Sequence, residues 1–151
     1  MAYHIYTTDG IVLGSVSVGE SNRYLYVLTK NLGLLGVRAQ GIRELRSKLR
    51  FALTDFSHVR VALVRGKDVW RVTSAVPFSS YQALFFDKEK LRVFARIASL
   101  LRRLVVGETE HAALFDFMFR TAVFLAAEKF TAKELACMEA LAALSVLDAP
   151  S

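Results

Sequence analysis

Side chains capable of acid–base, nucleophilic or metal chemistry are few in this sequence and lie far apart. The histidines, His4, His58 and His111, share no short spacing with an acidic residue, so we expect structural or surface roles for them. The one cysteine, Cys137, has small and apolar neighbours, which is typical of a core residue rather than a nucleophile. One cysteine also excludes an intrachain disulfide and a cysteine-based zinc site within these residues. We therefore predict a protein that is not an enzyme and has no cofactor and no metal.

Gly33, Gly36 and Gly41 lie close together, as glycines do in phosphate-binding loops. No Gly-Lys-Ser or Gly-Lys-Thr sequence follows them, although a P-loop needs one to hold the phosphates and their metal ion. We interpret these glycines as turn and barrel residues.

Positive charge is concentrated in the first half of the chain. The net charge is +6; residues 1–80 hold 11 basic and 5 acidic residues, whereas residues 81–151 hold 9 of each. Concentrated positive charge attracts polyanions and raises their rate of encounter. This asymmetry predicts a nucleic-acid-binding protein.

The elements that must position this charge have the pattern of a small β-barrel. Five segments rich in β-branched and aromatic residues alternate with turn signals, namely residues 5–18, 22–29, 34–40, 59–64 and 69–73. Several short strands separated by glycine-containing turns predict a barrel. Between the third and fourth strands, leucines at every fourth position of residues 42–53 predict a short helix or an ordered loop with one apolar stripe.

The third strand connects the predicted barrel to its most basic segment. Leu35, Val37 and Ala39 alternate with Arg38 and Gln40, so Arg38 and Gln40 point outward if the other three fill the barrel. We expect a continuous phosphate-binding stripe made of Arg38, Gln40, Arg43, Arg46, Lys48 and Arg50. A solvated polar face is the alternative interpretation of these residues.

Aromatic residues of the second strand add a candidate surface for stacking unpaired bases. Tyr24 and Tyr26 share one face of this strand, next to Arg23. Their neighbours Leu25 and Val27 are equally good core candidates, and only one face can point inward, so both interpretations stay open. Trp70 is expected in the core.

Residues after Pro77 have helical periodicity. The pattern predicts helices over residues 88–106 and 110–128, and a capping box at residues 131–134 opens a third helix that runs to about residue 147. The second of these is apolar nearly all round, so we expect it to be central in the bundle. No targeting segment and no transmembrane helix are expected.

A series of short motifs resembles the N-terminal region of the RecO family of bacterial DNA repair proteins. These are Gly19-Glu20-Ser21, Val27 to Leu34, Ala39-Gln40-Gly41-Ile42-Arg43, Ser47-Lys48-Leu49-Arg50 and Asp55-Phe56. Their order and spacing carry the resemblance, which covers about residues 5–80. The later helices are similar in kind but carry little motif.

The resemblance implies an α+β protein with a five-stranded OB-fold domain over residues 1–80 and a helical domain over residues 81–151. It implies a cytoplasmic, nucleoid-associated recombination mediator that binds single- and double-stranded DNA, anneals complementary strands and cooperates with RecR and single-strand-binding protein. The family's basic positions correspond to Arg38, Arg43 and Lys48, with Arg46 and Arg50 beside them.

Two features differ from the family pattern. Asp55 stands where the family usually has proline, and family members are longer, many with a four-cysteine zinc insertion. The chain is therefore expected to be a shorter member or part of a longer protein. An alternative function is an adaptor whose helical half binds the acidic tail of single-strand-binding protein, or RecR, in an apolar groove beside Arg102 or Arg103.

Overall fold

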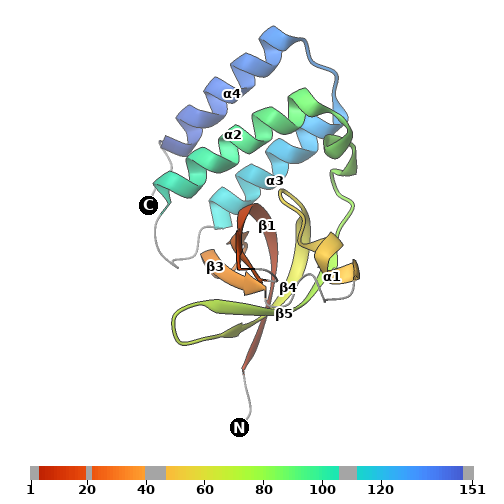
Figure 1. Ribbon diagram of the computed structural model, residues 1–151. Coiled ribbons are helices and arrows are strands. Elements are labelled where there is room, and N and C mark those ends of the chain that lie inside the picture. The colour runs from red at the N-terminus through yellow and green to blue at the C-terminus, as the bar shows by residue number, and fades with distance from the viewer. Residues whose placement is uncertain (1–3, 20–21, 40–46, 106–111, 148–151) are drawn as a thin grey trace.

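The computed structural model describes residues 4–19, 22–39, 47–105 and 112–147 of the chain (Figure 1). Its first half is a closed barrel with the strand order β1-β2-β3-β5-β4. The strands are β1 (Ile5–Val18), β2 (Asn22–Thr29), β3 (Gly33–Ala39), β4 (His58–Arg65) and β5 (Trp70–Pro77). All neighbouring strands are antiparallel except β3 and β5, which are parallel. This arrangement confirms the predicted five-stranded OB-fold barrel.

The helices follow the predicted order. They are α1 (Ser47–Ala52), the 3₁₀ helix η1 (Gln82–Phe86), α2 (Lys88–Leu104), α3 (Ala112–Ala127) and α4 (Ala132–Leu147). The capping box of α4 is confirmed, because the Thr131 N–H donates to a Glu134 carboxylate oxygen and the Glu134 N–H donates to the Thr131 hydroxyl. Helix η1 was not predicted from the sequence. None of the described helices is long and apolar enough to span a membrane.

The interior of the barrel is filled by alternate residues of each strand. Leu35, Val37 and Ala39 of β3 are buried, while Arg38 between them is exposed. Trp70 has only 3% of its surface exposed, which confirms that it is a core residue.

A second core joins the outside of the barrel to the helices. Ile11 and Leu13 of β1 point away from the barrel core, and they pack in one buried cluster with residues of α2, α3 and α4. The largest fully buried side chains on the helical side are Leu84, Phe94, Ile97, Leu101 and Met118. The helices therefore cover part of the outer face of the barrel. The division of the chain into two domains at residue 80 stays a prediction.

Helix α2, not α3, is the central helix of the bundle. Figure 1 shows α2 between α3 and α4, and α2 also packs on β1. The expectation that the apolar helix at residues 110–128 would be central is wrong. Helix α3 instead uses its wide apolar surface against η1, α2 and the barrel strands β1 and β2.

Helix η1 is fixed to the barrel by Tyr81. Its hydroxyl donates a hydrogen bond to the Phe56 carbonyl oxygen at 2.7 Å, and burial raises the pKa of this phenol. Phe56 has a φ of 70°, an uncommon conformation for a residue with a side chain. The Phe56 N–H donates to the Val12 carbonyl at 2.6 Å. Both backbone groups of this strained residue are therefore used to join the barrel to η1.

We predict that Phe94→Ala lowers the free energy of unfolding by about 3–5 kcal/mol. The Phe94 ring is fully buried and lies 5.9 Å and 6.1 Å, between ring centroids, from Phe56 and Tyr81. Urea unfolding followed by fluorescence of Trp70 and by helical circular dichroism measures this loss. The control, Phe124→Ala on the exposed side of α3, should cost less than about 1 kcal/mol. Equal losses in the two variants would contradict the shared core.

Candidate nucleic-acid interface

The tyrosines of β2 lie on the outer face of the barrel. Leu25 and Val27 are buried in the barrel core, whereas Tyr24 and Tyr26 are half-buried on the opposite face of the strand. Tyr26 packs against the core shared with the helices. Neither tyrosine therefore fills the barrel, Tyr26 packs on the helical side, and base stacking by either tyrosine stays a prediction.

Tyr24, Arg38 and Arg71 form one row across three neighbouring strands. Tyr24 on β2 pairs with Arg38 on β3, and Arg38 pairs with Arg71 on β5. Both arginines are exposed, and neither has an ion pair with a carboxylate that the structure describes. We call these three residues the basic row. It presents two guanidinium groups beside one aromatic ring.

Gly36 makes room for the ring of Tyr24. A Cβ at Gly36 would overlap the Tyr24 hydroxyl, so the phenol reaches over the backbone of β3. Tyr24 also meets Tyr26 edge to face, with 5.2 Å between ring centroids. The glycine and the neighbouring ring together hold Tyr24 beside Arg38.

Arg102 of α2 covers Tyr26, the tyrosine of this face that lies next to the helices. Its guanidinium carbon is 4.4 Å from the ring centroid of Tyr26, which is a cation–π contact. A Cβ at Gly14, which pairs with Tyr26, would overlap the guanidinium group. Arg102 therefore joins the helices to the barrel and adds positive charge at the edge of the tyrosine surface.

The turn between β4 and β5 extends the basic row. Arg65 and Lys67 join Arg38 and Arg71 around a shallow hollow of about 360 Å³, which also contains Asp68. The guanidinium carbon of Arg65 lies 5.5 Å from the centroid of the Trp70 ring. Sequence analysis did not single out Arg65, Lys67 or Arg71, because only the parallel pairing of β3 with β5 brings them to Arg38.

Arg23 does not join this cluster. Its guanidinium donates to the Ser15 hydroxyl and lies 3.4 Å from a carboxylate oxygen of Asp55. Asp55 and Ser15 therefore already occupy the guanidinium group of Arg23, whereas Arg38 and Arg71 have no such described partner.

The structure describes the remaining candidates only in part. Gln40, Arg43 and Arg46 lie outside the described residues, and of Lys48 only the backbone in α1 is described. Arg50 is exposed on α1. The continuous stripe from Arg38 to Arg50 stays a prediction, whereas the described structure places Arg38 with Arg71.

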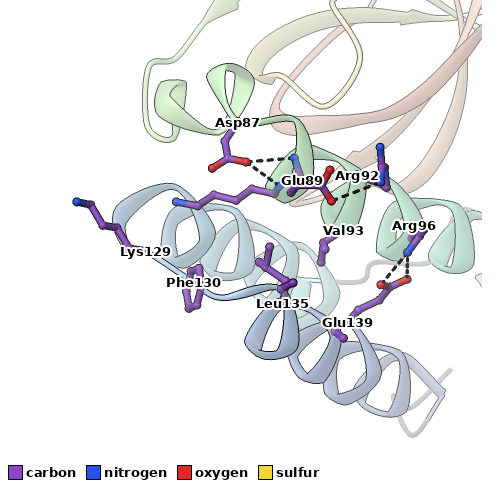
Figure 2. A pocket seen from close by; sticks show the side chains of 12 residues that line it. Asp87, Glu89, Arg92, Val93, Arg96, Lys129, Phe130, Leu135 and Glu139 are labelled. Atoms are coloured by element: carbon purple, nitrogen blue, oxygen red, sulfur yellow. Dashed lines mark hydrogen bonds and ion pairs between the residues drawn. The ribbon is translucent and has the colours of Figure 1, made fainter.

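A second hollow, of about 540 Å³, lies in the helical half between α2 and α4 (Figure 2). Phe130 and Leu135 lie at its floor, and the ammonium nitrogen of Lys90 is 5.6 Å from the Phe130 ring centroid. Figure 2 shows Arg96 directed at Glu139, and the two groups are 3.2 Å apart. The sequence predicted a groove beside Arg102 or Arg103. The hollow at Phe130 lies nearer the beginning of α2, but a further hollow of about 310 Å³ between α2 and α4 is lined by Leu100 and Arg103. What these hollows bind stays a prediction.

Comparisons with known proteins identify relatives of this chain. A family model described as "Recombination protein O N terminal" matches residues 1–81. A protein named DNA repair protein RecO from Heliobacterium modesticaldum is 35% identical over 66% of this chain and 37% of its own length. Proteins with the same name from Rubrobacter xylanophilus and Roseiflexus are 32% and 31% identical, over 77% and 80% of this chain. The matches span 46% and 42% of those two proteins, so the chain covers less than half of the length of these relatives.

We predict that Gly36→Ala displaces the Tyr24 ring from β3. The overlapping atom is the end of a flexible side chain, so the free energy of unfolding should fall by less than about 1 kcal/mol. Chemical shifts of the Tyr24 ring report the displacement. Gly33→Ala is the control: Gly33 has a φ of 82°, so this change should cost about 1–2 kcal/mol and leave Tyr24 in place. Unchanged Tyr24 shifts in Gly36→Ala would contradict the described packing.

Proposed function

Because the chain belongs to the RecO family of DNA repair proteins, we propose that it binds DNA as an accessory protein of recombinational repair. The observation that supports this function best is the basic row, in which Arg38 and Arg71 stand side by side on neighbouring strands next to Tyr24. Like charges on paired strands repel each other. A phosphate between the two guanidinium groups removes this repulsion and gains two charge-assisted hydrogen bonds.

The basic row binds the DNA backbone rather than base edges. Arg65 and Lys67 line the hollow at the turn between β4 and β5, and they extend the positive surface from the basic row to this turn. Binding to phosphates releases condensed counterions, so the affinity depends on salt and little on base sequence. Single and double strands are both ligands, because each presents phosphates. Tyr24 adds a stacking surface where the bases are unpaired.

Annealing follows from the same contacts. Two complementary strands repel each other through their phosphates, and cations that neutralise one or both backbones lower this repulsion. The bases stay free to pair, because the contacts are to phosphates. The proposed activity therefore needs no catalytic group, and the protein acts as a mediator rather than an enzyme. RecR and single-strand-binding protein are its proposed protein partners.

The hollow between α2 and α4 supports a second function, the binding of an acidic peptide. Phe130 and Leu135 provide apolar lining, and the four cations of the lining (Lys90, Arg92, Arg96 and Lys129) outnumber its three carboxylates (Asp87, Glu89 and Glu139) (Figure 2). Arg92 and Arg96 are paired with Glu89 and Glu139. A peptide with acidic residues before an apolar end, such as the tail of single-strand-binding protein, matches both features. The protein would then be an adaptor as well as a DNA-binding protein.

We predict that Arg38→Gln with Arg71→Gln weakens binding of single- and double-stranded DNA by about tenfold for each arginine. The slope of log affinity against log salt on single strands should decrease by about 0.7 for each phosphate that is no longer neutralised. Fluorescence anisotropy at several salt concentrations measures both quantities. Because the change removes two like charges from paired strands, the variant should be at least as stable as the wild type.

The matched control is Arg120→Gln with Lys133→Gln, which removes the same charge from exposed positions of α3 and α4. This control should bind DNA with nearly the wild-type affinity and slope. If both double variants weaken binding equally, only the net charge matters and the basic row is not the site.

We predict that Arg92→Glu with Lys129→Glu weakens binding of the acidic tail peptide of single-strand-binding protein by about tenfold or more. The reversed charges repel the peptide at the rim of the hollow. Titration of a fluorescent tail peptide measures the loss. The Arg38→Gln, Arg71→Gln variant should bind the peptide normally, and the loss of peptide binding in that variant instead would place the peptide on the barrel.

A further inference from the structure

An aromatic hollow of about 280 Å³ lies at the end of the barrel that faces η1. It opens between α1, the ends of β4 and β5, and η1. The side chains that form it are mostly rings, namely Phe51, His58, Phe78, Tyr81, Phe85 and Phe86. The DNA-binding surface proposed above does not include this hollow.

Two of these rings are exposed far more than packing requires. Phe51 has 66% and Phe86 has 85% of its surface exposed. They come from α1 and η1, two short elements on either side of the hollow. Large apolar side chains that stay exposed around a concave site are typical of a surface that binds a ligand.

Two arginines lie next to residues of the hollow. Arg50 precedes Phe51 on α1 and is exposed, and the Arg60 guanidinium lies 5.9 Å from the Phe78 ring centroid. Arg60 also bonds to Asp9 at 3.0 Å. The described residues that line the hollow include no carboxylate, but they include the polar groups of Thr54, Ser57 and Gln82. Asp55 and Asp87 follow the lining residues Thr54 and Phe86 in the sequence. Arg50 has no ion pair with a described carboxylate, so it is the cation near the hollow that can meet an anionic group of an aromatic ligand.

His58 lines the hollow and has one enclosed ring nitrogen without a described partner. Its Nδ1 lies 3.1 Å from the Ser80 hydroxyl, and its buried Nε2 has no hydrogen-bond partner among the described residues. Burial lowers the pKa of His58 more than nearby Asp9 raises it, so the ring is neutral at neutral pH. A buried polar atom without a partner costs free energy. Because this atom is enclosed, the polar groups that a ligand can reach at the hollow are those of Thr54, Ser57 and Gln82.

We propose that this hollow binds one unpaired base of single-stranded DNA, stacked against Phe51 and Phe86, with the adjoining phosphate near Arg50. The proposal rests on the proposed DNA binding and adds to it a site that distinguishes single from double strands. Every base has an aromatic face, so stacking of this kind tolerates any sequence. A base in a duplex cannot enter the hollow.

Strand β5 connects this site to the basic row. Arg71 lies near the beginning of β5, and Pro77, at its end, lines the hollow. Six residues at about 3.3 Å each place the two sites about 20 Å apart along the strand. Thr73 and Ser74 are exposed between them. One single strand that follows β5 would bind Arg71 through a phosphate and the hollow through a base.

We predict that Phe51→Ala with Phe86→Ala weakens binding of a thymidine oligonucleotide by about tenfold, because the stacking of one base is lost. An abasic oligonucleotide of the same length and a DNA duplex should bind the variant with the affinity that each has for the wild type. The salt slope should stay unchanged, since phosphate contacts are kept. Both rings are largely exposed, so folding should be preserved.

Phe124→Ala is the matched control, since it removes a half-exposed ring from α3, and it should bind every oligonucleotide like the wild type. Wild-type affinity of the double variant for the thymidine oligonucleotide would overturn the proposal. An equal loss for the abasic oligonucleotide would also overturn it, because the rings would then act through structure or phosphates.

Two further outcomes separate this proposal from the others. If the double variant binds DNA normally but no longer binds an acidic peptide with an apolar end, the hollow is a peptide site and the base site is wrong. If the wild type itself does not bind either oligonucleotide, the proposed DNA binding fails. Normal salt-dependent binding of the wild type with no effect of the phenylalanines removes only the base site.

Discussion

The parallel pairing of β3 with β5 is the interaction on which the basic row depends. It closes the barrel and aligns Val37 with Trp70 and Arg38 with Arg71. The first pair is buried in the barrel core, and the second points outward. The register that seals the barrel therefore also places two like charges side by side. The described ion pairs do not include Arg38 or Arg71. The buried contact of the two strands beneath them therefore keeps these two arginines side by side.

The helices divide the outer face of β2 and β3 into covered and open parts. Leu28 pairs with Leu34, and both pack against the helical core. In the next row outward, Tyr26 lies beneath Arg102. Tyr24 and Arg38 form the next pair on this face, and Arg102 does not cover them. Because the same face turns from apolar to aromatic to basic, the position of α2 determines where the exposed part of this face, the proposed DNA-binding surface, begins.

Local patterns predicted the strands, the capping box and the alternation of β3, because each depends on residues close together in the chain. They could not place Arg71 beside Arg38, because no local pattern fixes the register between strands so far apart in sequence. Apolar residues on both faces of β2 left the orientation of Tyr24 undecided, since the second face is apolar only where helices cover it. The same ambiguity explains why the helix at residues 110–128 was wrongly predicted to be central. A helix that is apolar on all sides can bury its surface against a barrel as well as against other helices.

A strand held only by its phosphates keeps all its bases free to pair, whereas a base stacked in the aromatic hollow cannot pair until it leaves. The two effects are similar in size, because stacking on aromatic rings contributes about 1–3 kcal/mol per base and a step of duplex DNA contributes about 1.4 kcal/mol. A complementary strand that pairs with the neighbouring bases can therefore withdraw the bound base at little net cost. A barrel with cations at one end of β5 and one aromatic hollow at the other would favour unpaired strands and still release them as duplex.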